Sequence, residues 1–424
     1  MVVMHRSVEI TAAVFAAYLK CPTMAYLTAH GEDPPDTFLA VTRGCISAAY
    51  KARAGQSLRA SLIGVAPIHF SRLADDTARD ATTLFVDCET ASYVCNQPAS
   101  AWVDVRVKRS KPGRDYVPIT YSAWDKIDQF DELLVCFGAV AIGQATGSRI
   151  PANGKVIYGA GHRAKTVRIA NYLTKWREVI EATASICRTS EPPPLVLNKH
   201  CPVCEFKSRC RSLAVEQDHL SLLAAMTTKE RMKCQEKGIS TITQLSYGYR
   251  PRRRRRIRPA ALQGSQPVKH DHKLKALAIK NARIHVVGSP LLSIEGTPVF
   301  MDVEGMPDRD FYYLIGLRYE AQDRYIEQSF WADAQEEEQG IWLKCLRALK
   351  QIDNPRIVHY GAYESRFLKH MRERSTPTAS DAEFVDRLIA GSVNLLATMY
   401  GRIYFPTYTN SLKEIARWLG LQWT

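Results

Sequence analysis

The stretch CPVCEFKSRC, residues 201–210, places Cys201, Cys204 and Cys210 in one short segment. A fourth cysteine, Cys21, stands far upstream in the phrase YLKCPTMAYL. Four thiolates from two distant segments can enclose an iron–sulfur cluster or a zinc ion. Such a site would join the two ends of one domain, so these cysteines decide how the first part of the chain folds.

The composition is that of a globular protein with more than one core. The chain has 424 residues, of which 46% are hydrophobic. Its eleven cysteines are an odd number for a disulfide framework, so reduced thiols and a metal site fit better. We find no apolar run that could span a bilayer and no signal-peptide pattern at the N-terminus. We therefore expect a cytoplasmic protein that does not bind membranes.

The positive charge is concentrated in one segment. The formal net charge is +14, and the segment from Arg250 to His285 contains twelve Lys and Arg against one Asp, a surplus of +11. The segment includes five consecutive arginines: Arg252, Arg253, Arg254, Arg255 and Arg256. Such a run attracts phosphate polyanions by counterion release, which predicts binding of DNA or RNA. The alternative is a solvated linker.

Hydrophobic periodicity predicts a mixed α/β unit over residues 1–215. The expected helices cover residues 8–19, 131–142 and 169–186, and the expected strands cover 83–88, 100–107, 116–121 and 155–158. A second α/β unit is expected over 284–424, with strands over 298–305 and 311–320 that could form an antiparallel hairpin. Between the units we expect a helical segment, 218–248, and a basic linker, 249–283.

The helical segment has the pattern of a helix-hairpin-helix over residues 226–245. Thr228 is expected to cap the first helix, Gly238 to supply the turn, and Ser240 or Thr241 to cap the second. The turn amides and the second helix N-terminus of such a motif can hold a backbone phosphate. An ordinary helical hairpin would show the same short pattern.

Two carboxylates, Asp302 and Glu304, stand two residues apart in the predicted strand VFMDVEG. Residues i and i+2 of a strand project from one face, so both can reach a common cation. The apolar neighbours suggest that these carboxylates are buried, which favours a metal such as Mg²⁺ or Mn²⁺. The alternative is a strand end that faces water.

The phrase HYGAYESRFLKHM adds a third carboxylate, Glu364, where a strand turns through Gly361 into a helix. With this motif, residues 284–424 resemble the RNase H-like exonuclease superfamily with the DEDD carboxylate set. The closer likeness is to predicted single-strand nucleases fused to RecB-like domains. The resemblance implies that Asp302, Glu304 and Glu364 bind Mg²⁺ or Mn²⁺ and carry catalysis, with Glu364 where the family usually has Asp.

The last motif of that family, an Asp preceded by Tyr or His, should follow the phrase LKEIARWLGLQW. The sequence reaches Thr424 directly after this phrase. We therefore expect either a domain truncated at its C-terminus or a weak catalyst.

Residues 1–215 resemble the iron–sulfur subclass of the PD-(D/E)xK nucleases, which use one N-terminal and three C-terminal cysteines. The resemblance implies that Cys21, Cys201, Cys204 and Cys210 hold a 4Fe–4S cluster, with zinc as the alternative. Asp104 in AWVDVRV matches the first metal carboxylate, but the expected Glu-x-Lys reads Thr120-Tyr121-Ser122. We therefore expect this unit to bind rather than to cut.

The sequence thus predicts a restriction-endonuclease-like domain, a helix-hairpin-helix and an RNase H-like domain. The predicted function is metal-dependent hydrolysis of phosphodiester bonds in single-stranded or end-bearing DNA or RNA, of the exonuclease type. A catalytically inactive nucleic-acid-binding protein is the first alternative, and a redox-sensing regulator that uses the cysteines is the second. A helicase or repair partner is left open.

Overall fold

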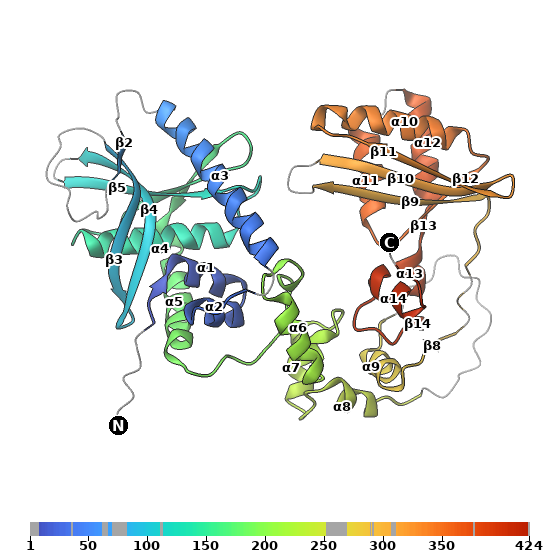
Figure 1. Ribbon diagram of the computed structural model, residues 1–424, viewed down its shortest axis with the longest axis horizontal. Coiled ribbons are helices and arrows are strands. Elements are labelled where there is room, and N and C mark those ends of the chain that lie inside the picture. The colour runs from blue at the N-terminus through green and yellow to red at the C-terminus, as the bar shows by residue number, and fades with distance from the viewer. Residues whose placement is uncertain are drawn as a thin grey trace. The chain divides into compact units, whose positions relative to one another are not determined.

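The computed structural model describes residues 8–34, 37–61, 67–69, 83–110, 113–251, 269–288, 290, 292–306, 311–375 and 378–422. The chain divides into two compact units, Met1–Ala214 and Val215–Thr424 (Figure 1). The arginines Arg252, Arg253, Arg254, Arg255 and Arg256 lie outside the described residues, so their predicted role stays a prediction.

The first unit is built on a mixed seven-stranded sheet with the order β2-β3-β4-β5-β6-β7, in which β1 also pairs with β4. Strands β3 and β4 form a long antiparallel hairpin, and β5 and β6 run parallel. The strands are β1 (Ile10–Thr11), β2 (Pro67–His69), β3 (Thr83–Val94), β4 (Gln97–Ser110), β5 (Gly113–Ser122), β6 (Asn153–Tyr158) and β7 (Arg163–Arg168).

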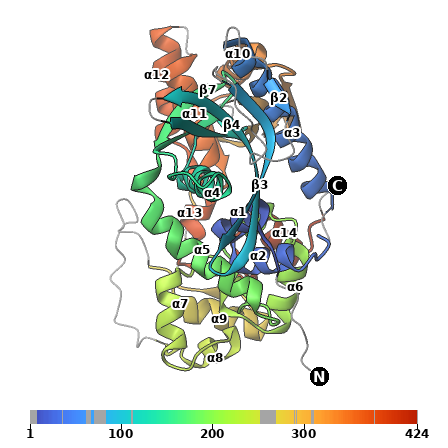
Figure 2. The ribbon, with the colours of Figure 1, turned by 90° about the vertical axis from the view of Figure 1, so that its left-hand side faces the viewer.

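Helix α4 (Gln129–Ala145) forms the centre of the first unit's core. Asp128 caps it through a capping box with Asp131, and most of its apolar residues are buried. The helix runs along the sheet in Figure 1 and is seen nearly end-on in Figure 2. The other helices are α1 (Ala12–Lys20), α2 (Pro22–Ala29), α3 (Thr37–Ser61), α5 (Leu173–Arg188) and α6 (Lys207–Glu216). A 3-10 turn, Ile169–Asn171, precedes α5, so the single helix expected over 169–186 is interrupted at its start.

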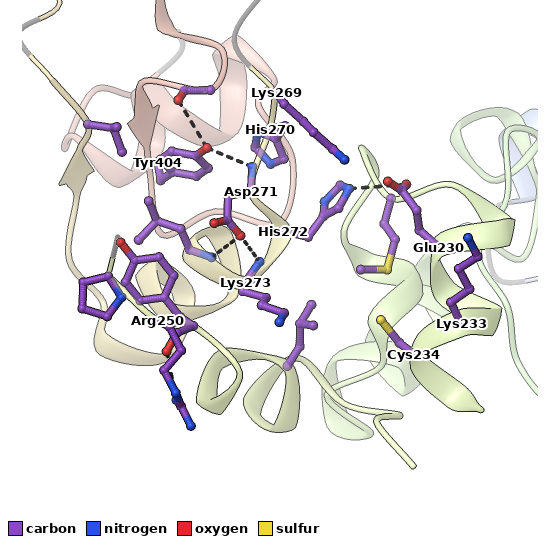
Figure 3. A pocket seen from close by; sticks show the side chains of 17 residues that line it. Glu230, Lys233, Cys234, Arg250, Lys269, His270, Asp271, His272, Lys273 and Tyr404 are labelled. Atoms are coloured by element: carbon purple, nitrogen blue, oxygen red, sulfur yellow. Dashed lines mark hydrogen bonds and ion pairs between the residues drawn. The ribbon is translucent and has the colours of Figure 1, made fainter. Parts of the chain in front are cut away.

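The second unit begins with short helices around a cavity (Figure 3). These are α7 (Thr228–Gln235), α8 (Ile242–Tyr247) and α9 (His272–Asn281), and the small ladder of β8 (His285–Val286) and β14 (Ile403–Tyr404) lies beside them. The cap of α7 is Thr227 rather than the expected Thr228, because its side chain and that of Glu230 form the capping box. Thr241 caps α8, as one of the two expected residues.

A five-stranded sheet with the order β11-β10-β9-β12-β13 forms the rest of the second unit. Strands β9 and β10 form the predicted antiparallel hairpin, β11 extends it, and β12 lies parallel to both β9 and β13. The strands are β9 (Thr297–Met306), β10 (Phe311–Ala321), β11 (Arg324–Trp331), β12 (Pro355–His359) and β13 (Val393–Asn394). The helices are α10 (Glu338–Lys350), α11 (Tyr363–Arg374), α12 (Ala379–Ala390), α13 (Leu395–Met399) and α14 (Leu412–Trp418).

The core of this unit lies between the sheet and its amphipathic helices. Trp342 of α10 and Phe367 of α11 are fully buried in one hydrophobic cluster with Val299 and Val303 of β9. This packing fixes one face of β9 toward the helices and turns its other face outward. Among the described residues, no helix is both long and apolar enough to cross a membrane.

Candidate functional site

The two carboxylates of β9 lie on its outward face. Met301 and Val303 are buried, whereas Asp302 and Glu304 between and after them are exposed. The two side chains therefore share one face, as predicted from their spacing. The expectation that they are buried is wrong, because the alternation of the strand turns only Val299, Met301 and Val303 to the core.

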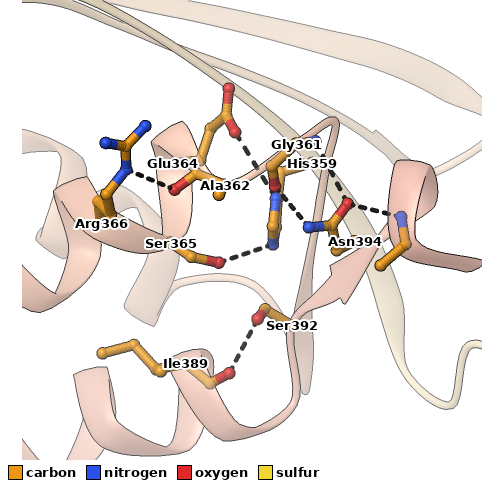
Figure 4. Close-up of polar contacts among 10 residues, drawn as sticks. His359, Gly361, Ala362, Glu364, Ser365, Arg366, Ile389, Ser392 and Asn394 are labelled. Atoms are coloured by element: carbon orange, nitrogen blue, oxygen red, sulfur yellow. Dashed lines mark hydrogen bonds and ion pairs between the residues drawn. The ribbon is translucent and has the colours of Figure 1, made fainter. Parts of the chain in front are cut away.

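Glu364 is placed by a tight turn between β12 and α11 (Figure 4). Gly361 has a φ of 101°, which a residue with a side chain rarely adopts. The Asn394 side chain holds this turn on both sides: its Oδ1 accepts from the Gly361 amide at 3.2 Å, and its Nδ2 donates to the Gly361 carbonyl at 2.6 Å. Helix α11 therefore begins at Tyr363 and carries Glu364 in its first turn.

Glu364 is buried beside His359, and the pair is incompletely satisfied. Their Oε2 and Nδ1 atoms lie 3.6 Å apart, and neither makes a hydrogen bond within the described part of the chain. The other ring nitrogen, Nε2 of His359, is held by the Ser365 hydroxyl at 3.0 Å. Buried polar atoms nearly always make hydrogen bonds, so two atoms that face each other without one indicate a place for a ligand.

These groups open onto one cavity. The cavity has a volume of about 510 Å³, and Asp302, His359 and Glu364 are among its lining residues. Glu304 is not among the described residues that line this cavity. Its carboxylate acts on Tyr363, the neighbour of Glu364, because burial, Tyr312 and Glu304 together raise the pKa of Tyr363 to about 12. Helix α11 thus places Glu364 at the same cavity as Asp302 of β9.

Hard divalent cations bind carboxylate oxygens, so the chemistry of Asp302, Glu304 and Glu364 fits Mg²⁺ or Mn²⁺. The observation that favours such an ion is the buried Oε2 of Glu364, which makes no hydrogen bond with any residue that the structure describes. Within the described ranges, however, no three Asp, Glu, His or Cys side chains stand together as a ready metal-binding group. A bound cation would therefore have to draw these side chains inward.

Sequence reasoning did not identify His359 or Asn394 as part of this site. His359 stands at the end of a predicted strand, five residues before Glu364, which is the only signal in the sequence. Asn394 carries none, because its contact with Gly361 spans 33 residues and depends on the pairing of β12 with β13.

Asp104 of the first unit is already surrounded by protein donors. Its carboxylate accepts from the Asp87 amide at 3.0 Å and from the Tyr121 hydroxyl at 2.7 Å. The ammonium of Lys51, from α3, lies 3.4 Å away and also pairs with Asp87. A cation of the protein thus stands where a metal ion would bind, so Asp104 as placed does not fit a metal site.

The structure brings Cys21, Cys201, Cys204 and Cys210 around one small apolar cavity of about 20 Å³. Burial raises the pKa of Cys201, Cys204 and Cys210, the last to about 11, and neighbouring thiols of this group add to each shift. A bound cation would offset this, because metals bind the thiolate form. The four thiols fit a thiophilic metal in chemistry. As they stand, no three of them form a ready metal-binding group among the described residues, so a bound metal would have to draw them closer together.

The backbone amides of the predicted helix-hairpin-helix turn already donate hydrogen bonds within the chain. Gly238 does supply the turn, with a φ of 73°. The amides of Gly238 and Ile239 donate to α7, those of Ser240 and Thr241 to Gln244, those of Ile242 and Thr243 to Asp218, and that of Gln244 to Thr241. The carboxylate of Asp218 thus stands at the second helix N-terminus. The amides of this turn thus have partners within the chain, and the binding of nucleic acid at Gly238 stays a prediction.

A comparison with known protein families supports the prediction made for the C-terminal part of the second unit. Residues 299–424 match the family model of the RNase H superfamily. The C-terminal region therefore carries an RNase H-like domain, which confirms this part of the predicted resemblance. Domains of this superfamily have a nuclease-type fold and generally act on nucleic acid.

No curated protein matches the sequence. Among solved structures, the "Crystal structure of SSO0001" is similar over 48% of this chain and 86% of that chain, with 14% sequence identity and a TM-score of 0.29. This score is too low to establish a shared fold.

Proposed function

We propose that the chain is a metal-dependent nuclease that hydrolyses phosphodiester bonds of single-stranded or end-bearing DNA or RNA through its C-terminal domain. The observation that carries this proposal is the buried Oε2 of Glu364, which makes no hydrogen bond within the described ranges, in a residue that lines the same cavity as Asp302. Asp302, Glu304 and Glu364 would hold Mg²⁺ or Mn²⁺. The ion would supply a Lewis acid for the phosphoryl oxygen and a more acidic water.

Neighbouring side chains hold Glu364 and His359 in place. Asn394 fixes the turn at Gly361, and this turn orients the helix that carries Glu364. His359 lies 3.6 Å from Glu364 and is itself oriented by Ser365. His359 is therefore close enough to hold a proton or to bind a phosphoryl oxygen at this site.

We propose a different role for the first unit, which is to bind and not to cut. The contacts of Asp104 with Lys51, Tyr121 and the Asp87 amide support this. We further propose that its four cavity cysteines bind iron or zinc, with an iron–sulfur cluster as the form that the resemblance suggests. The metal would then have a structural role, joining the two ends of this unit.

The test is an end-labelled nuclease assay with Mn²⁺ or Mg²⁺ on single-stranded DNA and RNA. We expect Asp302→Ala to lower the cleavage rate on the order of a hundredfold or more, because it removes a ligand of the ion that would stabilise the transition-state charge. Glu320→Ala removes an exposed carboxylate from the neighbouring strand β10 and should leave the rate unchanged. Equal cleavage by the Asp302→Ala variant would exclude this site. Salt-sensitive binding without cleavage under either metal would favour the inactive binding protein.

A further inference from the structure

The second unit contains a larger cavity that the proposed nuclease site does not use. It has a volume of about 770 Å³ and lies among α7, α8, α9 and the β8–β14 ladder (Figure 3). None of its lining residues belongs to the carboxylate site of β9 and α11. A cavity of this size is in the range that holds small organic ligands.

The floor of this cavity is apolar and aromatic. Met226, Leu245, Leu274 and Tyr404 line it and are all buried. His270 stacks on Tyr400 with ring centroids 4.8 Å apart and also packs against Tyr404. Burial, His272 and Lys275 together lower the pKa of His270 to about 4, so its ring is neutral near pH 7 and belongs to the aromatic floor. Such a surface suits a flat ring system.

The rim of this cavity is cationic. Four cationic side chains line it, namely Lys233, Arg250, Lys269 and Lys273, and each of them is exposed. Figure 3 shows Lys269 extending toward the pair of Glu230 and His272. A cluster of this sign at the mouth of a cavity attracts an anionic ligand.

The two acidic residues of the cavity are engaged by the protein. Glu230 lies 3.4 Å from His272 and accepts from the Thr227 amide at 2.9 Å. Asp271 caps α9 by accepting from the Lys273 and Leu274 amides. Among the described residues, neither carboxylate forms an ion pair with a lysine of the rim, and the four cations of the rim outnumber the two acids.

We propose that this cavity binds a nucleotide, with the base on the apolar floor and the phosphate at the rim of Lys233, Lys269 and Lys273. The proposal rests on the proposed nucleic-acid function, because that function makes a phosphate-bearing base the expected ligand. The proposed binding surface is the cavity of this helical segment and not the hairpin turn, because the amides of the turn already donate hydrogen bonds within the chain. The nucleotide could be part of a strand or free, since both present the same chemistry.

The test is a binding measurement on the full chain in EDTA, so that it does not depend on cleavage. The probes are adenosine 5′-monophosphate, adenosine, inorganic phosphate and a fluorescent single-stranded oligonucleotide. We expect the monophosphate to bind at least about tenfold more tightly than adenosine or phosphate alone, because it engages both floor and rim. Tighter binding of the oligonucleotide would assign the cavity to a strand, and binding of the monophosphate at equal affinity would assign it to a free nucleotide.

The double variant Lys269→Ala/Lys273→Ala should weaken monophosphate binding about tenfold or more. For the oligonucleotide it should also reduce the slope of log K against log salt by about 0.7 for each phosphate that a lysine no longer neutralises. Lys229→Ala, an exposed lysine of α7 outside the cavity, is the matched control, and Lys269→Arg/Lys273→Arg should restore binding. Thermal unfolding by circular dichroism verifies that each variant is folded.

Unchanged binding in the folded double variant would overturn the proposal, and so would phosphate that binds as tightly as the monophosphate. These outcomes are independent of the nuclease test. If Asp302→Ala loses cleavage but the lysine variants bind as tightly as the wild type, only the proposal that this cavity binds a nucleotide is refuted. If nucleotide binding depends on the lysines but no metal-dependent cleavage is found, only the proposed nuclease function is refuted.

Discussion

Lys275 is a cation within the core of the second unit. Its side chain is 3% exposed, and its ammonium donates to the Phe405 carbonyl at 2.9 Å, the Thr407 hydroxyl at 3.3 Å and the Asn410 side chain at 2.9 Å. These three acceptors come from the segment before α14, so one side chain of α9 connects it to the C-terminal part of the fold. Such a buried donor is costly to remove, because each acceptor would be left without its partner.

We therefore expect Lys275→Met, which keeps the length of the side chain, to lower the free energy of unfolding by about 2 kcal/mol. Lys413→Met replaces an exposed lysine of α14 and is the control, with no expected change. Urea unfolding of both variants at neutral pH measures the difference. An equal stability of the two variants would show that the three hydrogen bonds contribute nothing net.

The same residue predicts a pH dependence. Burial lowers the pKa of Lys275 to about 8, from 10.5 for an ordinary lysine. Between these values the unfolded chain binds more protons than the folded chain, so the contribution of Lys275 to stability rises with pH across this window. The stability difference between the wild type and Lys275→Met should therefore change in favour of the wild type from pH 7.5 to 9.5. A change in the opposite direction over this range would contradict the lowered pKa.

At this scale, the sequence could predict residues by chemical type and spacing but not by tertiary contact. The spacing of Asp302 and Glu304 placed them on one face, because strand alternation is a local rule. Lys51 and Asn394 could not be predicted, because each acts through a partner that is distant in the sequence. The burial of Asp302 and Glu304 was predicted wrongly, since the choice of face depends on what packs against the sheet.

At the scale of elements, the contact of α4 with the sheet depends on a residue without a side chain. A Cβ at Gly154 of β6 would lie 2.1 Å from Cγ1 of Val135 in α4. The backbone of β6 must therefore stay close to the helix, and nothing larger than a hydrogen fits there.

We expect Gly154→Ala to destabilise the first unit by about 1–3 kcal/mol, because it overpacks the contact between helix and strand. Gly161→Ala is the matched control, since a Cβ at Gly161 would meet nothing within 4 Å. Differential scanning calorimetry of the two variants gives the comparison. If Gly154→Ala unfolds at the same temperature as Gly161→Ala, α4 can move away from the sheet without cost.

The predicted elements were most accurate where periodicity was strong. Strands β9 and β10 and helix α4 follow clear apolar patterns, and all three were predicted within a few residues of their bounds. Helix α3, Thr37–Ser61, was not predicted, because its small and polar residues follow no helical apolar stripe. The contact of Lys51 with Asp104 was therefore not predicted either, because Lys51 belongs to this helix.

At the scale of the whole molecule, the two units have separate cores. The core of the first includes Phe15, Phe137 and Ile180, and the core of the second includes Trp342 and Phe367. Units with their own cores unfold as separate transitions unless a large interface couples them. A change confined to one unit should then shift one transition only.

The cysteine cavity provides the means to test this. Cys21 comes from the start of the first unit, and Cys201, Cys204 and Cys210 come from its end, so a metal bound there would close a loop of nearly the whole unit. The unfolded chain has no preformed site and loses its affinity for the metal, so the free energy of metal binding adds to the stability of the folded unit. A metal at this site should therefore stabilise the first unit and leave the second unaffected.

We expect the purified chain to contain iron or zinc, and Cys204→Ser to lower the bound metal more than about tenfold. The same variant should lower the melting temperature of one transition only, because the second core does not include this site. Cys45→Ser replaces an exposed cysteine of the same unit outside the cavity and should retain the metal. Elemental analysis with visible absorption separates zinc from iron–sulfur, and calorimetry locates the shifted transition. Equal metal content in the Cys204→Ser and Cys45→Ser variants would show that the four thiols lie together for packing alone.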